Sequence, residues 1–271
     1  MTDRSASITA SERIRGTGRT LLPWITTPAL LLAFVLAWHV YVSATNVSAF
    51  ILPAPADVWS SWLELLGSPR AGAHTGWTVY ATVFGFGCAL VIGVGLGVVI
   101  GRVPWLEATL NPFIVATQVV PKVALVPLFV VWFGFGVTSK VIIAAVLAFF
   151  PILTNTVLGV KSIESGHRDV MTSLDAGRWQ VFRQLELPSA LPFILTGMEV
   201  GIVLAIIGAI VGEYLGGNTG LGAMLIAKMN AFETDALFAV IIQMTLLGFL
   251  FYFVIGMLRR VLVPWHRSGE R

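Results

Sequence analysis

KSIESGHRDVMTSLDAGRWQVFRQLELP, residues 161–188, is a charged segment between two long apolar runs, and the rest of the fold is inferred outward from it. It holds more than a quarter of the Lys, Arg, Asp and Glu residues of the chain. A plain solvated connector needs no apolar residues at helical spacing, so we expect this segment to dock on a partner protein. The expected apolar face is Val181, Phe182, Leu185 and Leu187, and the expected polar rim is Arg178, Arg183 and Glu186.

The composition is that of an integral membrane protein. The chain has 271 residues, of which 56% are hydrophobic and 11% charged, with a mean hydropathy of +0.86, whereas soluble domains carry about 25% charged residues. At about 20 apolar residues per span, this length suits one domain of six spans. The formal charge of +3 comes mostly from the chain ends, so nucleic acid is not an expected partner. Cys88 is the single cysteine, and its apolar surroundings predict a buried side chain.

Windows with few or no charged residues locate the expected spans within a transmembrane domain at about 23–260. They are about 23–44, 75–101, 110–133, 139–160, 190–214 and 236–260, and residues 1–22 and 261–271 are expected to be tails. Six spans put both tails on one side of the membrane. Basic residues concentrate in the tails, at Arg102 and in residues 161–188, so the positive-inside rule predicts that both termini are cytoplasmic.

Small residues and prolines mark positions where spans pack or bend. Gly93, Gly97 and Gly101 recur every four residues in the second span, which lets two helices approach closely. The partner helix lies either in the same chain or in a second subunit. The third span is interrupted by three prolines, each of which removes a backbone donor and favours a kink: Pro112, Pro121 and Pro127.

Pro121 and three ionisable residues within the spans are candidates for a translocation path, because polar groups at membrane depth are costly and commonly functional. Lys122 follows Pro121, and it is either a path residue or a donor to carbonyls freed at the kink. Glu199 either lines the path or pairs with a basic residue near the cytoplasmic surface. Glu213 either takes part in transport or accepts hydrogen bonds from the glycine-rich turn at 214–222.

The loop at 46–74 is expected on the outer side. It contains Leu52-Pro53-Ala54-Pro55-Ala56-Asp57, followed by tryptophans at 59 and 62. Asp57 is expected to cap a short helix that lies at the membrane interface, with Trp59 and Trp62 as anchors. Contact with an external protein is the alternative.

The spacing within residues 161–188 resembles a known signature. Asp169-Val170-Met171 is followed by three residues, then Asp175, nine residues and Leu185-Glu186-Leu187-Pro188. This resembles the cytoplasmic loop of binding-protein-dependent ABC importer permeases, which reads Glu-Ala-Ala, three residues, Gly, nine residues, Ile-x-Leu-Pro. Further similarity lies at 52–55, 132–136 with Ser139-Lys140, 189–197 and 213–222, in an order similar to the nitrate, sulfonate and taurine branch.

Two departures from that signature bear on the loop. Asp175 stands where the family has glycine, and only the acid at Asp169 remains of the Glu-Ala-Ala triplet. Asp tolerates turn and left-handed backbone conformations better than most non-glycine residues. A bend between two short helices is therefore still expected at Asp175.

The resemblance implies an all-α integral membrane protein with about six transmembrane helices, like type I ABC importer permeases, with short cytoplasmic coupling helices in the loop 161–189. It implies no cofactor on this chain, ATP and Mg²⁺ on two copies of an ATPase subunit, a second permease copy, and an extracytoplasmic solute-binding protein. These would assemble in a bacterial-type plasma (inner) membrane bilayer and import a small solute of the sulfonate, taurine, nitrate or vitamin-precursor type. The implied ATPase-coupling residues are Asp169, Asp175, Ala176, Gly177, Phe182, Leu187 and Pro188.

Missing motifs narrow the alternatives. The sequence has no GxxxxGK[ST] phosphate loop, no HExxH and no GxSxG, so we expect no ATP hydrolysis or other catalysis by this chain. The alternative function is a stand-alone secondary transporter or channel. Such a protein would need internal repeats and coupling-ion ligands at mid-membrane, and no convincing repeat of residues 139–214 is found.

Overall fold

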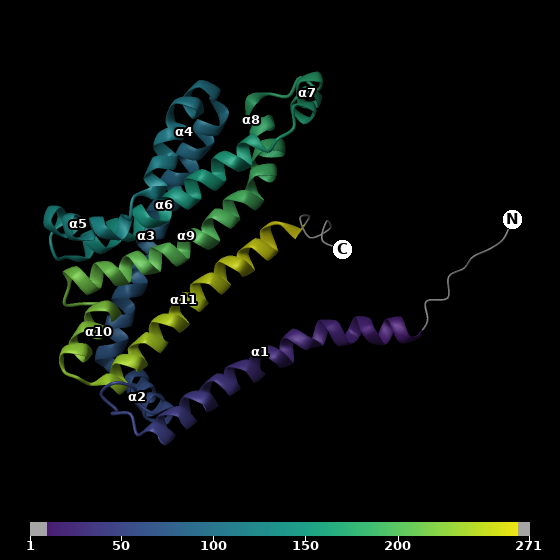
Figure 1. The fold of residues 1–271 in the computed structure, drawn as a ribbon. Coiled ribbons are helices and arrows are strands. Elements are labelled where there is room, and N and C mark those ends of the chain that lie inside the picture. Colours follow the sequence, from purple (N-terminus) through teal and green to yellow (C-terminus); the bar gives the residue numbers. More distant parts are fainter. Residues whose placement is uncertain (1–9, 265–271) are drawn as a thin grey trace.

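Three long helices, α3, α6 and α9, form the centre of the molecule, and most of the other helices pack against them, whereas α1 projects away from this core (Figure 1). The computed structural model describes residues 10–264, with side chains from residue 25 onward, and the described chain is helical without strands. Its elements are α1 (Ala10–Thr45), α2 (Pro55–Gly67), α3 (Pro69–Arg102), α4 (Pro104–Val119), η1 (Lys122–Leu125), α5 (Val126–Phe133), α6 (Val137–Lys161), α7 (Ser165–Ser173), α8 (Arg178–Val181), η2 (Phe182–Glu186), α9 (Leu187–Gly216), α10 (Leu221–Asn230) and α11 (Thr234–Leu262).

Five helices are long and apolar enough to cross a membrane: α1 from Ile25, α3, α6, α9 with its extension from Arg178, and α11. Together with the broken segment described below, they give up to six spans, as the sequence predicts. Part of the expected tail at 1–22 is helical, because α1 begins at Ala10, whereas the stretch that is apolar enough to span begins at Ile25. Extending an existing helix costs less than starting one, so the helical apolar run can continue backward into more polar sequence.

The glycines of α3 pack against α6 within the same chain, which is the first of the two alternatives for this repeat. A Cβ on Gly97 would lie 2.6 Å from Cβ of Thr156, and a Cβ on Gly93 would lie 3.0 Å from Ile152. Ile152 is fully buried at the centre of the main apolar core. Cys88 lies on the opposite, exposed face of α3, so the prediction that its side chain is buried is wrong.

The expected third span at 110–133 is not one helix. α4 ends at Val119, and the segment Lys122–Phe133 leaves it at an angle of 82°. The break lies at Pro121, whose ring disfavours a helical conformation for the preceding residue, and Val120 is extended at φ −64° and ψ 125°. Pro112 lies inside α4 without ending it, and Pro127 is accommodated in the first turn of α5.

α2 forms where the sequence predicts a short helix, but Asp57 does not cap it. The N-cap is Ala54, which is extended and makes no side-chain hydrogen bond, and proline follows at the first helical position. Asp57 lies in the first turn instead. Trp59 is exposed, whereas Trp62 donates from Nε1 to Oε1 of Gln243 at 3.1 Å and so ties α2 to α11.

Candidate functional site

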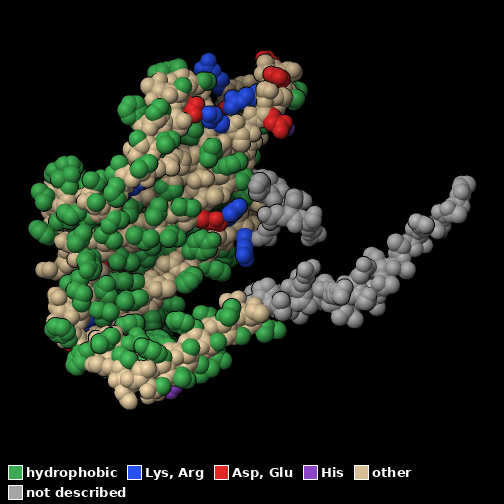
Figure 2. All heavy atoms as spheres, in the orientation of Figure 1, with side chains coloured by type: hydrophobic (Ala, Val, Ile, Leu, Met, Phe, Trp, Pro, Cys, Tyr) green, Lys and Arg blue, Asp and Glu red, His purple; other side chains and the backbone are tan. Residues whose placement is uncertain are grey.

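Charged side chains gather at the end of the molecule that carries α7 and α8, and hydrophobic side chains cover most of the flank seen in Figure 2. This end contains the whole segment 161–188. A lipid-facing flank must be apolar, whereas a polar end can face water and another protein. The candidate coupling site is therefore built from α7 onward.

α7 ends at a bend whose backbone explains the aspartate there. Asp175 has φ +51°, in the left-handed region, and the amide of Ala176 donates to the carbonyl of Met171 at 3.0 Å. Gly177 then starts α8, and its amide donates to Oε1 of Gln180 at 2.8 Å. Asp is one of the few non-glycine residues that adopt this conformation at modest cost, so Asp175 occupies the family glycine position in a bend of this kind.

The second half of the segment is continuous with the membrane span, which differs from the expected pair of separate short helices. α8 runs through the π-helical turn η2 into α9, and the amide of Leu187 donates to the carbonyl of Phe182. Pro188 has no amide hydrogen, and its ring would clash with a carbonyl four residues earlier in a regular α-helix. A π-turn widens the helix at this point, so Pro188 is tolerated and the span extends to Arg178.

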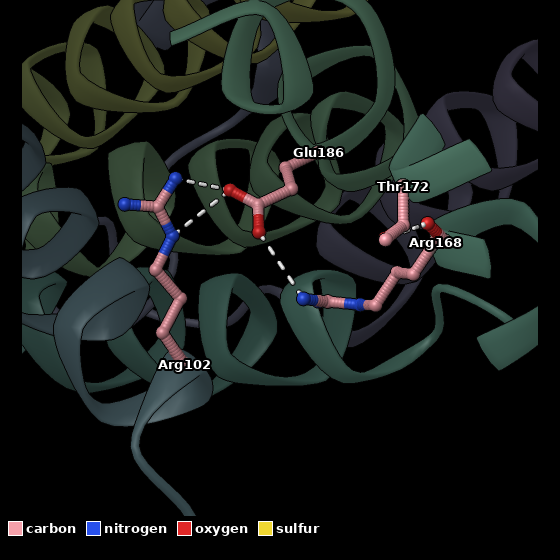
Figure 3. A network of polar contacts seen from close by, with 4 residues as sticks. All are labelled: Arg102, Arg168, Thr172 and Glu186. Atoms are coloured by element: carbon pink, nitrogen blue, oxygen red, sulfur yellow. Dashed lines mark hydrogen bonds and ion pairs between the residues drawn. The ribbon is translucent and has the colours of Figure 1, made fainter. Parts of the chain in front are cut away.

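Glu186 lies at the centre of an ion-pair network that joins three elements (Figure 3). Its Oε2 accepts hydrogen bonds from Nε of Arg102 at 2.9 Å and from Nη2 of the same guanidinium, and its Oε1 lies 3.4 Å from Nη1 of Arg168. The carboxylate side chain is only 7% exposed. A buried carboxylate requires such partners, so the last turn of α3, α7 and the entry to α9 are held together through Glu186.

This network was missed by the sequence analysis, which assigned Glu186 to an exposed polar rim. In the structure Glu186 is buried, and the guanidinium of Arg102 also lies 5.0 Å from the ring centroid of Phe182. Glu186 comes four residues after Phe182, on the same helical face. A carboxylate on an apolar face needs a cation, and that signal points to Arg102 at the end of the second span.

The same segment also carries three large exposed apolar side chains, those of Val170, Leu174 and Trp179. They are here called the coupling surface. Their side chains are 57%, 72% and 69% exposed, and sequence analysis had not singled them out. Of the predicted coupling residues, Asp169, Asp175, Gly177 and Leu187 are exposed, and Ala176, Phe182 and Pro188 are partly buried. Large exposed apolar side chains at a charged end are typical of a protein interface.

The predicted path residues do not form one site. Pro121 and Lys122 line a common cavity of about 430 Å³ beside the break after α4. Glu199 lies elsewhere and pairs with Arg259 of α11, at 3.0 Å between Oε2 and Nη1. Lys122 donates no hydrogen bond to freed carbonyls in the described part of the chain, and its Nζ lies over the ring of Phe150, 5.0 Å from the centroid.

Glu213, the fourth path candidate, holds the glycine-rich turn. Its side chain is fully buried and accepts a hydrogen bond from the amide of Gly222 at 2.9 Å. Oγ1 of Thr78 in α3 lies 2.9 Å from both carboxylate oxygens and accepts from the amide of Leu221 at 2.8 Å. Nζ of Lys140 donates to the carbonyl of the nearby Thr219 at 2.6 Å. The turn, α3, α6 and α9 are thus joined at the end of the molecule opposite to Glu186 (Figure 1).

The residues that the structure describes contain no group of three His, Cys, Asp or Glu side chains positioned to hold a metal ion. Instead, the charged side chains at each end bind neighbouring side chains or backbone amides at the same end. What this arrangement can do is mechanical: the exposed surface on α7 and α8 is fastened to spans that reach the opposite end of the molecule.

Comparison with known proteins gives the family. Residues 89–268 match the family model described as binding-protein-dependent transport system inner membrane component. A riboflavin transport system permease protein, RibX of Chloroflexus aurantiacus, is 38% identical over 95% of this chain and 96% of its own. A putative aliphatic sulfonates transport permease protein, SsuC of Bacillus subtilis, is 30% identical over 93% of this chain and 92% of its own.

A solved structure shares the fold. A chain of the MetNI methionine ABC transporter in inward-facing conformations superimposes with a TM-score of 0.55 at 19% identity, over 69% of this chain and 93% of that chain. The resemblance predicted from the segment 161–188 and the all-helical fold are confirmed. The chain belongs to the family of binding-protein-dependent transport system inner membrane components, the permeases of ABC importers.

Proposed function

We propose that this chain is the transmembrane permease subunit of an ATP-driven importer and forms the path for a small solute that an external binding protein delivers. The observation that carries this proposal is the attachment of the coupling surface to the membrane spans. Glu186 binds Arg168 of α7 and Arg102 of α3 from the first turns of the long helix that becomes α9. Force applied to α7 therefore reaches two spans through one buried carboxylate.

The proposed partners of this chain follow from its membership of the family. Two copies of a separate ATPase subunit bind ATP and Mg²⁺ and dock on the coupling surfaces of two permease copies. Docking of the loaded binding protein and closure of the ATPases then favour the same outward-open state, which gives alternating access. The two named relatives are permeases for riboflavin and for aliphatic sulfonates, which supports a small organic solute here.

The proposed orientation of the protein in the membrane follows from the distribution of its basic residues. The end with α7 carries Arg102, Lys161 and Arg168, so the positive-inside rule puts this end and both termini in the cytoplasm. A membrane-impermeant maleimide should then label Ser60→Cys in α2 on intact cells and Ser173→Cys in α7 only after permeabilisation, in a Cys88→Ser background. The reverse labelling pattern would reject this orientation.

Reconstitution tests the function itself. Proteoliposomes that contain the permease, its ATPase and the binding protein should accumulate solute on ATP addition, and omission of either partner should abolish accumulation. Transport by the purified chain alone would support the stand-alone secondary transporter or channel instead.

A matched pair of tryptophan variants tests the coupling surface. Trp179→Ala should weaken co-purification of the ATPase by about tenfold or more, as expected for an exposed aromatic anchor of an interface. Trp59→Ala removes a tryptophan of similar exposure at the opposite end and should leave the complex intact. Equal co-purification of both variants would remove Trp179 from the interface.

A further inference from the structure

The cavity of about 430 Å³ beside Pro121 lies near mid-membrane, because Phe150 and Pro151 on its wall are close to the middle of α6. One wall comes from the end of α4 and from η1, and the other comes from α6 with one residue of α9. The 82° break between α4 and the following segment separates the two helical parts at this point. The lining residues are Gln118, Pro121, Lys122, Val123, Leu147, Phe150, Pro151, Thr154, Asn155 and Leu204.

Lys122 brings a positive charge into this cavity without a protein counter-charge. Its side chain is half-buried, and among the described residues it makes no ion pair or hydrogen bond. Its Nζ lies over the face of the Phe150 ring, 5.0 Å from the centroid. A cation–π contact offsets only part of the desolvation cost of an ammonium at this depth. The cavity is therefore electrostatically incomplete as it stands.

Lys140 provides the contrast within the same membrane domain. Its Nζ is satisfied by the carbonyl and the hydroxyl of Thr219, at 2.6 and 2.8 Å. The chain thus supplies partners for the structural lysine at the outer end and leaves the lysine of the cavity unpaired. A partner for Lys122 has to come from outside the described part of the chain.

The other lining groups define what such a partner must look like. Nδ2 of Asn155 donates to the carbonyl of Pro151 at 2.8 Å, and Oγ1 of Thr154 donates to the carbonyl of Phe150 at 2.9 Å. Both side chains are oriented by their own helix, and among the described residues the second amide hydrogen of Asn155 has no acceptor. The remaining wall is apolar and includes the Phe150 ring and Leu204. The cavity therefore offers one cation, an amide donor and an apolar platform, the usual composition of a small-molecule site.

We propose that this cavity binds the transported solute inside the membrane domain, and that the solute is a small organic anion. Its anionic head lies against the ammonium of Lys122, and its apolar body lies on the ring of Phe150. That the bound anion is also the transported solute rests on the proposed function. Binding of the anion is argued from the cavity alone. It adds a second selection step inside the membrane to the selection made by an external binding protein.

The single cysteine of the chain makes a direct test possible. In a Cys88→Ser background, Thr154→Cys places one thiol on the cavity wall, and Ser60→Cys places a control thiol on the exposed surface of α2. The purified full chain is treated with 2-sulfonatoethyl methanethiosulfonate, an anion, or with the cationic 2-(trimethylammonio)ethyl reagent. The measured quantity is the ratio of the two modification rates at residue 154, normalised to the ratio at residue 60.

Lys122 should raise this normalised ratio about tenfold, as a nearby cation favours the anionic reagent in a partly desolvated site. Lys122→Gln should remove the preference, and Lys122→Arg should keep it, which separates loss of charge from loss of fold. A ratio that is the same with Lys122 and with Gln at this position would overturn the proposal.

Ligand protection tests binding of the anion itself. Benzenesulfonate carries an anionic head on an aromatic body, and benzenesulfonamide has the same body with a neutral head. Benzenesulfonate should slow modification of residue 154 with Lys122 present and not in Lys122→Gln, whereas benzenesulfonamide should protect weakly in both. Equal protection by the two compounds would also overturn the proposal. Neither measurement uses the ATPase or the binding protein, so failure of the proposed function would show separately, as absent ATP-driven accumulation in the reconstituted complex.

Discussion

At the scale of single residues, the attachment of α7 to the membrane spans depends most on Glu186. It is a buried carboxylate with two arginine partners from different elements, and both arginines are partly exposed. Removing the charge leaves Arg102 and Arg168 without a counter-ion at the point where α7 meets the spans. Water can solvate the exposed parts of both arginines, so the cost in stability is smaller than for a fully buried ion pair.

Glu186→Gln should lower stability by about 1–2 kcal/mol, which thermal unfolding in detergent would report. In the reconstituted complex it should also raise the number of ATP molecules hydrolysed per solute imported, because α7 is no longer fastened to α3. Glu164→Gln is the control, since Glu164 is an exposed carboxylate of the same segment without an ion pair among the described residues. Equal coupling ratios for the two variants would contradict the role given to Glu186.

Asp175 carries the second prediction at this scale. Because its φ is +51°, Asp175→Gly should keep or slightly raise stability, whereas Asp175→Val should lose about 1–2 kcal/mol through its β-branched side chain. Thermal unfolding and ATPase co-purification measure both effects. Asp169→Val is the matched control, because Asp169 is also exposed but lies within α7. A valine at 175 that is as well tolerated as a valine at 169 would mean that the bend is not strained.

At the scale of elements, the packing of α3 on α6 depends on glycines that face one direction only. A Cβ at Gly97 would meet Cβ of Thr156 at 2.6 Å, whereas Gly95 in the same helix has no atom within 4 Å of such a Cβ. Gly97→Leu should therefore destabilise the folded chain by about 1–3 kcal/mol or more through overpacking, and Gly95→Leu should be close to neutral. Size-exclusion chromatography and thermal unfolding in detergent would measure this. Similar losses from the two variants would show that the effect comes from leucine in a span and not from the α3–α6 contact.

The elements also show what the sequence could and could not predict. Long apolar runs identify α3, α6, α9 and α11 because each satisfies its backbone internally and needs only length and apolarity to be recognised. The proline pattern predicts a kink in the third span, and the structure has the break at Pro121, whereas Pro112 stays inside α4. The π-turn before Pro188 was not predicted, since a proline near a helix start is equally compatible with a new helix beginning there.

Side-chain partners were predicted where they are local in sequence. The hydrogen bond from Gly222 to Glu213 joins residues within one turn region, and it corresponds to one of the two alternatives drawn from the sequence. Arg102 and Glu186 are far apart along the chain, and only the packing of α3 against α9 brings them together. The partners of two path candidates are likewise distant in sequence, since Glu199 pairs with Arg259 of α11 and Glu213 contacts Thr78 of α3.

At the scale of the whole molecule, α3 and α9 are clamped to each other at both ends. Glu186 binds Arg102 at the end with α7, and Glu213 binds Thr78 at the opposite end, where the glycine-rich turn begins. Thr78 and Arg102 are separated by about 36 Å of helix at 1.5 Å per residue. Two clamps this far apart resist sliding and tilting of one helix against the other, so the pair should move as one body when α7 is displaced.

This arrangement gives a prediction that only the whole molecule can test. Thr78→Val removes the hydrogen bond to Glu213, and Glu186→Gln removes the ion pair with Arg102. The effects of the two variants on thermal stability should add, because sites this far apart rarely couple in folding energy. Their effects on transport should not add: if α3 and α9 move as one body, loss of either clamp already lets the helices slip, and the double variant should transport little worse than the poorer single variant. Uptake and unfolding measured on the same four proteins form the double-mutant cycle. Additive losses in uptake would mean that the two ends act independently and that α3 and α9 do not form a rigid pair.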